Sequence, residues 1–198
     1  MIALVLLDLQ RGILRAPGLP WDDPRIPDKV LEAAGRLLVA GRKAGVPVIH
    51  VGVARARRSG LLDEPRTAVA DKSGKAPRQV MPLAPGTPDV EFLLEAGADE
   101  ERVYKTGVSA FHGTALDGHL RSQGVRDVII AGVFTHMVVE STARQGFDLG
   151  YVMHVCADAC CAPRRQIHDS ALSVGIPGFA RVHDIEAALK LLEAGARD

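Results

Sequence analysis

Short apolar runs alternate with helical stretches along the chain, and this alternation restricts the fold more than any other feature of the sequence. A strand that helices cover on both faces has a continuous apolar run rather than an alternating one. We therefore predict an α/β fold: a doubly wound, six-stranded, mostly parallel sheet with helices on both faces, a Rossmann-like three-layer sandwich. The predicted strands are residues 2–7, 46–53, 102–105, 128–133, 151–157 and 179–183.

The predicted crossover helices have apolar residues three and four positions apart. The clearest covers residues 28–44, with Pro27 just before it and Gly45 at its end. The last begins with Asp184, a typical N-cap residue. No shift in composition and no internal repeat divides the chain, so one domain of residues 1–198 is expected. The other predicted helices are residues 114–123, 138–149, 164–174 and 184–194.

Charge and cysteine content narrow the classes of partner. Lys plus Arg equals Asp plus Glu at 24 each, so no global basic surface is expected and nucleic acid is an unsuitable partner. The apolar start is about seven residues long, far below the roughly twenty that a membrane helix needs, and it has no basic region typical of a signal peptide. Cys156, Cys160 and Cys161 are odd in number and crowded, which favours a reducing cytoplasm over a disulfide framework.

Two charged residues end predicted strands, where ligands bind in open α/β sheets. Asp8 follows the first strand and Lys105 ends the third. Alone, Asp8 is explained equally well by a loop capped through backbone amides, and Lys105 by a surface lysine whose stem packs on the sheet edge. Together they would keep each other charged, and the cation would stabilise a developing negative charge.

A third feature is the stretch GVFTHMVVESTARQGFDLGY, residues 132–151, which reads as a strand that turns sharply into a helix. Many α/β enzymes hold a nucleophile at such a turn, but here the chain has Met137, Val138 and Val139. Backbone amides at the start of a helix bind an anion whatever the side chains are. An anion site at this turn is therefore compatible with valine.

Taken together, LLDLQ, YKTGVSAFHGTALDGHL and GVFTHMVVESTARQGFDLGY followed by VCADAC resemble the isochorismatase-like hydrolase superfamily, the cysteine hydrolases. The resemblance implies a triad of Asp, Lys and Cys, in which Asp8 and Lys105 match the first two. The position of the nucleophile falls on Val138. An isopropyl group has no lone pair, so covalent acyl transfer from this position is excluded.

The nucleophile could be relocated to another residue. Ser141 lies one helical turn later, but no histidine base is evident beside it. Cys160 and Cys161 follow another strand in a segment that packs small residues in the family, so structural thiols are favoured. His136 is predicted at the mouth of the pocket as a substrate donor or an acid or base, with a hydrogen-bonded turn residue as the alternative.

Another branch of the superfamily needs no nucleophile. Isochorismatase and the enzymes that resemble it use the first-strand Asp to protonate a vinyl ether, and water captures the resulting cation. The resemblance therefore implies a hydrolase of a small anionic or amide-bearing metabolite, with Asp8 as general acid or base beside Lys105. Two alternatives stay open: a catalytically silent relative that binds a ligand or partner in the former pocket, and a valine that replaced cysteine in this chain alone.

The resemblance also suggests substrate-binding residues. Phe111 and Phe134 are expected to wall the pocket, and Gln10 and His136 to contact the substrate. The backbone amides of Phe134 and Val138 are candidates for an anion hole.

Further expectations concern the backbone, cofactors and assembly. The family often has a non-proline cis peptide before the turn, which here falls between Val133 and Phe134. We expect no metal and no other cofactor, because HVGVARARRSG lacks the Asp-x-His pair of the nicotinamidase branch. Arg55, Arg57 and Arg58 would pair with an anionic substrate group or form a solvated charge run. A small-molecule substrate and a homodimer or homotetramer are the expected partners.

Overall fold

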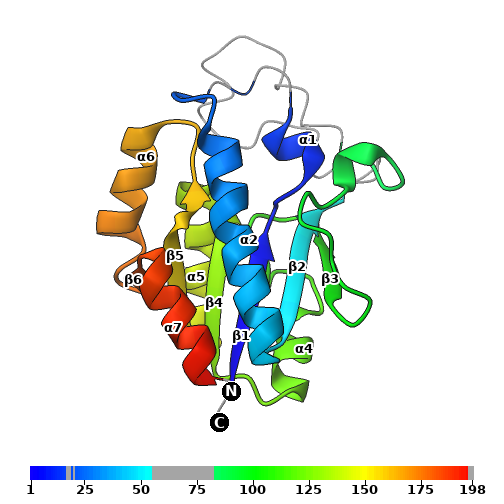
Figure 1. Cartoon of the computed structure of the whole chain (residues 1–198), viewed down its shortest axis with the longest axis vertical. Coiled ribbons are helices and arrows are strands. Elements are labelled where there is room, and N and C mark those ends of the chain that lie inside the picture. The colour runs from blue at the N-terminus through cyan, green and yellow to red at the C-terminus, as the bar shows by residue number, and fades with distance from the viewer. Residues whose placement is uncertain (17–18, 20, 55–82, 196–198) are drawn as a thin grey trace.

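Six parallel strands form the centre of the protein (Figure 1). The computed structural model describes residues 1–16, 19, 21–54 and 83–195. The order of strands in the sheet is β3-β2-β1-β4-β5-β6, and every pairing between them is parallel. The predicted doubly wound sheet is thereby confirmed. The strands are β1 (Ile2–Leu7), β2 (Val48–Val53), β3 (Glu101–Lys105), β4 (Asp127–Val133), β5 (Val152–Cys161) and β6 (Ala180–His183).

The direction of winding reverses between β1 and β4, which are neighbours in the sheet. From β1 the chain adds β2 and β3 on one side, and it then returns to add β4, β5 and β6 on the other. Such a reversal leaves a crevice at the carboxyl ends of the two central strands. The residues that follow β1 and β4 are therefore the first candidates for a site.

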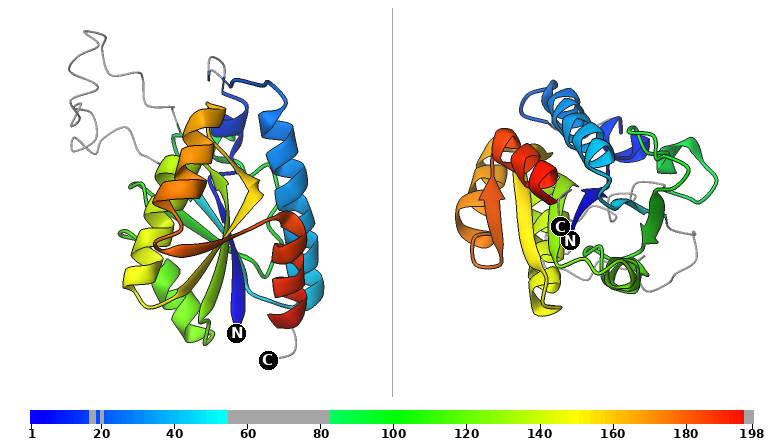
Figure 2. Two further views of the ribbon diagram at one scale, coloured as in Figure 1. Left: turned by 90° about the vertical axis from the view of Figure 1, so that its left-hand side faces the viewer. Right: turned by 60° about the horizontal axis from the view of Figure 1, so that its bottom comes forward.

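Helices cover both faces of the sheet, as Figure 2 shows. One face packs against α2 (Ile26–Ala44) and α7 (Ile185–Gly195), and α4 (Leu116–Ser122) and α5 (Glu140–Asp148) cover the other. The predicted N-cap is confirmed, because Asp184 Oδ1 accepts the N–H of Ala187 at 2.8 Å. None of the described helices is both long and apolar enough to cross a membrane.

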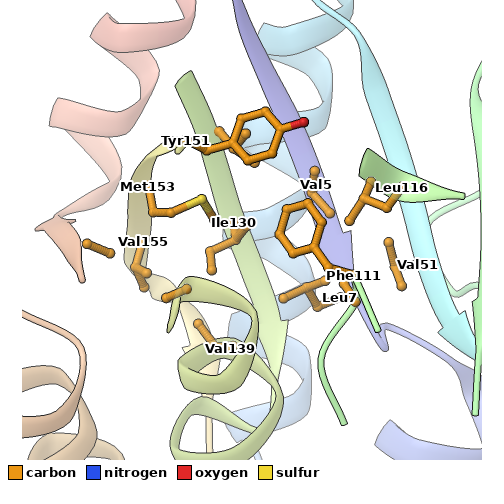
Figure 3. Close-up of a cluster of buried hydrophobic side chains, with 14 of the residues drawn as sticks. Val5, Leu7, Val51, Phe111, Leu116, Ile130, Val139, Tyr151, Met153 and Val155 are labelled. Atoms are coloured by element: carbon orange, nitrogen blue, oxygen red, sulfur yellow. The ribbon is translucent and has the colours of Figure 1, made fainter. Parts of the chain in front are cut away.

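Two hydrophobic clusters, one on each face, enclose the sheet. Alternate residues of a strand point to opposite faces, so Val5 and Leu7 join the α4/α5 cluster while Leu4 and Leu6 join the α2/α7 cluster. Figure 3 shows the first cluster, with Phe111 close to Leu7. The sheet is thus buried on both sides up to the edge that carries the polar residues.

The structure differs from the predicted elements mainly near the carboxyl edge. β5 continues to Cys161 instead of ending at residue 157, and its register shifts between Ile130 and Gly132 of β4. The predicted helix 138–149 begins with a π-helical turn, η2 (Thr135–Val139), that leads into α5. The predicted helix 164–174 is divided into α6 (Arg165–Ser170) and the π-helical η3 (Ala171–Gly175).

Two short elements in the connections have no counterpart in the prediction. They are α1 (Arg11–Leu14) after β1 and η1 (Pro88–Val90) before β3. Arg55, Arg57 and Arg58, predicted to pair with an anionic substrate group or to form a solvated charge run, fall within residues 55–82, which lie outside the described residues.

Candidate active site

Asp8 and Lys105 meet at the carboxyl edge of the sheet. Asp8 directly follows β1, and Lys105 is the last residue of β3, with β2 between the two strands. Lys105 Nζ lies 2.9 Å from Asp8 Oδ2, and it also donates to the carbonyl oxygen of Gly107 at 3.3 Å. The side chains of Lys105 and Asp8 are only 1% and 2% exposed. The structure therefore brings together the two charged residues that the sequence singled out.

The backbone at Asp8 is left-handed, with a φ of 57°. Aspartate and asparagine adopt this conformation more readily than most other residues. The Asp8 amide donates to the carbonyl oxygen of Val51 at 2.8 Å, which anchors the turn to β2. This backbone conformation directs the carboxylate of Asp8 toward the end of β3, where Lys105 lies.

The turn after β4 has the cis peptide that was predicted between Val133 and Phe134. The amides of Met137, Val138 and Val139 all donate to the carbonyl oxygen of Phe134, at 3.1, 2.9 and 3.2 Å. The N–H of Val138 is therefore engaged within the turn. The predicted role of this amide, and of the Phe134 amide, in an anion hole stays a prediction.

Val138 lies at the position where the sequence resemblance predicts the family's nucleophile. Its side chain belongs to the same core cluster as Leu7, the residue before Asp8, and it is 4% exposed. Met137 is instead 44% exposed, so its side chain does not fill the site. The turn thus buries an isopropyl group at this predicted position.

Gln10 is fully buried just after Asp8. Its Oε1 accepts the N–H of Val53 at 2.7 Å, and its Nε2 donates to the carbonyl oxygens of Val53 and Val90 at 3.0 and 2.9 Å. Because both the oxygen and the nitrogen of this side-chain amide are hydrogen-bonded to backbone groups, the geometry favours a structural role. The predicted contact between Gln10 and a substrate stays a prediction.

The two aromatic rings predicted to wall the pocket do not lie together. Phe111 is 5% exposed and stacks on Tyr151 in the α4/α5 cluster, with ring centroids 5.6 Å apart (Figure 3). Phe134 packs against the other cluster and stacks on Trp21 at 6.3 Å. The structure assigns Phe111 to the core and leaves Phe134, with Trp21, near the turn.

His136 lies in the turn next to Phe134, with ring centroids 6.3 Å apart. Its Nδ1 is buried and has no hydrogen-bond partner among the described residues. The ring lines a pocket of about 460 Å³ against α6 and η3, and Asp8, Lys105 and Val138 are not among the described residues that line it. Burial lowers the pKa of His136, although Glu140 opposes the shift. Its predicted contact with a substrate stays a prediction.

The alternative nucleophiles are poorly suited to attack. Burial raises the pKa of Cys156 to about 11 and that of Cys161 to about 12, and it raises the pKa of Cys160 well above its usual range. All three side chains are free and buried, and a thiol that remains protonated is a weak nucleophile. Ser141 lies half-buried in the first turn of α5.

Sequence reasoning missed one contact at the turn. Thr135, the first residue of η2, is fully buried, and its Oγ1 lies 2.8 Å from Nδ1 of His168 in α6. The two residues are 33 positions apart, so local sequence could not pair them. The sequence signal that could have pointed to this contact was His168 itself, a histidine within the helix predicted after the fifth strand. Within the described ranges, no three His, Cys, Asp or Glu side chains are grouped so that they could hold a metal ion.

Comparison with known proteins defines the class. The isochorismatase domain family matches residues 2–187, so the chain belongs to the isochorismatase family, whose members are hydrolases. It is 32% identical over 191 residues to the uncharacterised isochorismatase family protein YecD of Escherichia coli O157:H7, covering 96% of this chain and 95% of that protein.

Two further relatives carry more specific names. The ureidoacrylate amidohydrolase RutB of Acinetobacter baylyi is 29% identical over 170 residues, covering 80% of this chain and 69% of that protein. A solved structure of a cysteine hydrolase from Pseudomonas syringae pathovar phaseolicola superposes with a TM-score of 0.80 at 25% identity, covering 98% of this chain and 93% of that one. These similarities agree with the fold.

Proposed function

We propose that this hydrolase acts on a small metabolite with Asp8 as general acid or base, with Lys105 as the adjacent positive charge, and without a protein nucleophile. The observation that carries the proposal is the buried ion pair of 2.9 Å between these side chains at the carboxyl edge of the sheet, where Asp8 follows β1, one of the two strands at the switch in strand order. A buried ion pair is often no more stable than apolar residues of the same volume, so stability alone is a weak reason to keep one.

The residue at position 138 decides which chemistry remains. Valine cannot form an acyl-enzyme, and the native thiols are buried and protonated. Water must then attack the substrate directly. The protein must then transfer a proton and stabilise the charge that develops on the substrate. Asp8 can transfer the proton, and Lys105 can stabilise the charge.

Two substrate classes fit this arrangement. In a vinyl ether, Asp8 in its neutral acid form would protonate the alkene carbon, water would add to the resulting oxocarbenium ion and return one proton to the Asp8 carboxylate, and the hemiketal would collapse to a carbonyl compound and an alcohol. In an amide, Asp8 would take a proton from water as the water attacks the carbonyl carbon, and return it to the leaving nitrogen. The positive charge of Lys105 favours a substrate with an anionic group, and a carboxylate-bearing vinyl ether agrees best with Val138.

The test is a substrate panel combined with intact-mass analysis. The purified protein is incubated with small carboxylate-bearing vinyl ethers, amides and esters, and reactions are quenched during turnover. We expect hydrolysis without any covalent adduct on the protein. An adduct of substrate mass on any thiol or hydroxyl would contradict a mechanism without a nucleophile.

A second candidate, a catalytically silent binding protein, is favoured by one observation: the apolar Val138 is packed into the core. It predicts no turnover of any compound in the panel together with an increase in melting temperature in the presence of one of them. The panel therefore separates the two candidates directly.

A further inference from the structure

A single hydrogen bond between side chains connects the turn η2 to helix α6. Oγ1 of Thr135 and Nδ1 of His168 are 2.8 Å apart. Thr135 is fully buried, so its hydroxyl is shielded from water and depends on this partner. Position 138, the nucleophile position of the family, lies within the same turn.

The two side chains are held from independent parts of the chain. Thr135 follows β4 after one residue, Phe134, whereas His168 comes from the helix after β5. Hydrogen-bonding groups at the first residue of a turn fix its rotation about the preceding strand. A shift of this turn would move side chain 138 relative to Asp8, because Asp8 follows the neighbouring strand β1.

The His168 ring has the properties expected of a neutral hydrogen-bonding group. Burial lowers its pKa, with Arg165 acting in the same direction and Asp169 and Asp158 opposing. A neutral imidazole has one N–H and one lone pair, so Nδ1 either accepts from Oγ1 or donates to it. The contact is therefore a hydrogen bond in either tautomer.

The His168 ring also borders a pocket, so the residue can be substituted to test the contact. His168 lines a pocket of about 470 Å³ between the start of α2, the end of β5 and α6, together with Cys160 and Cys161. A substitution at His168 therefore changes a pocket wall as well as the contact with Thr135. Variants at this position should be better tolerated than variants of a fully enclosed residue.

We propose that His168 is a positioning residue that, through Thr135, fixes the turn η2 and so sets the placement of side chain 138 relative to the Asp8–Lys105 pair. It acts at a distance from the substrate and carries no catalytic step. The inference rests on the proposed function in one respect: it assumes that the turn η2 borders the active site.

The test measures the geometry of the turn without a substrate. In a Val138→Cys background, the introduced thiol is alkylated with iodoacetamide across a range of pH, and peptide mass spectrometry separates it from the three native cysteines. Its rate and its apparent pKa report its surroundings, because only the thiolate reacts. The background is then combined with Thr135→Val or His168→Leu, which remove the hydrogen bond from either side.

We expect both changes to alter the alkylation rate by about tenfold or more, since a misplacement of about 1 Å can change the rate at a site by about 10²-fold. Thr135→Ser keeps an Oγ atom and His168→Asn keeps a polar atom at the δ position, so both should restore the parent rate. His119→Leu in α4 is the matched control, because this partly exposed histidine lies in a helix on another part of the sheet.

Rates within twofold of the parent in both Thr135→Val and His168→Leu would overturn the proposal, even if their melting temperatures fall, because that combination shows a purely structural contact. If His168→Leu does not fold, Thr135→Val and its Thr135→Ser rescue carry the same test. Failure of the proposed hydrolysis would leave the alkylation result intact, so the two proposals can fail separately.

Discussion

Nζ of Lys105 lies 2.9 Å from Oδ2 of Asp8, although the two residues are 97 positions apart and β2 separates their strands. Neither side chain is more than 2% exposed. An ion pair in this environment is stabilised by attraction between its partners and destabilised by their loss of hydration. Removal of one partner leaves the other charge buried, so the two side chains should behave as one unit in stability and in function.

Lys105→Met should lower the free energy of unfolding by about 3–5 kcal/mol, because it leaves the carboxylate of Asp8 buried beside an apolar group. The double variant Asp8→Asn/Lys105→Met should lose less than the sum of the single variants, since no charge is then left uncompensated. Urea denaturation measures all three values. Lys190→Met, an exposed change in α7, should stay within about 0.5 kcal/mol of the parent. Additive losses in the double variant would show that the pair is not coupled.

Gly132→Ala should destabilise the fold by about 4 kcal/mol or more, which is exceptional for a single substitution. The residue has a φ of 141°, and a Cβ atom there would overlap the carbonyl oxygen of Leu7 in β1. Gly118→Ala is the control: a Cβ atom added there would meet no neighbouring segment within 4 Å, so the change in α4 should stabilise by up to about 1 kcal/mol. Thermal unfolding of both variants checks the contrast, and similar melting temperatures would contradict it.

Gln10→Leu should destabilise the protein by about 1–3 kcal/mol, because it leaves buried backbone groups of Val53 and Val90 without the partners that the amide supplies. Gln123→Leu, an exposed change at the end of α4, controls for the substitution itself. Equal urea midpoints for the two variants would show that the Gln10 amide is not structural and would favour its predicted contact with a substrate.

Acid should destabilise the fold below pH 6.5. Burial is the main cause that lowers the pKa of four histidines below their ordinary 6.5: His50, His136, His168 and His183. The unfolded chain, whose histidines keep the ordinary value, then binds more protons than the folded chain. The contribution is complete above pH 6.5 and is lost as the pH falls below it. The urea midpoint should therefore be lower at pH 5.5 than at pH 7.5, and an equal or higher midpoint at pH 5.5 would contradict the assignment.

The sequence predicted the sheet because strands buried on both faces must be apolar throughout. The same reasoning located Asp8 and Lys105, since a charged side chain at the end of such an apolar run is costly unless it is paired or functional. It placed the end of β5 too early, at residue 157, because the strand continues to Cys161 through a register shift opposite Gly132 that local composition does not reveal.

Contacts between distant segments could not be predicted from the sequence alone. Nothing in the sequence shows that the Gln10 amide is occupied by the backbone or that Phe111 stacks on Tyr151 within the core. The hydrogen bond from Thr135 to His168 likewise depends on where α6 packs against the turn. The resemblance suggested Gln10 and Phe111 as substrate-binding residues, and that role stays a prediction; the contacts that these two side chains make within the fold could be seen only in the structure.

The central claim is that Asp8 performs the proton transfer in a site without a nucleophile. Asp8→Asn is the suitable variant, because asparagine tolerates the left-handed φ of 57° at this position. Its kcat/KM on whichever vinyl ether or amide the parent hydrolyses should fall by about 10²–10⁴-fold, the usual contribution of a general acid or base. Asp148→Asn, an exposed change at the end of α5, should retain the parent value. A folded Asp8→Asn protein with undiminished kcat/KM would contradict the claim.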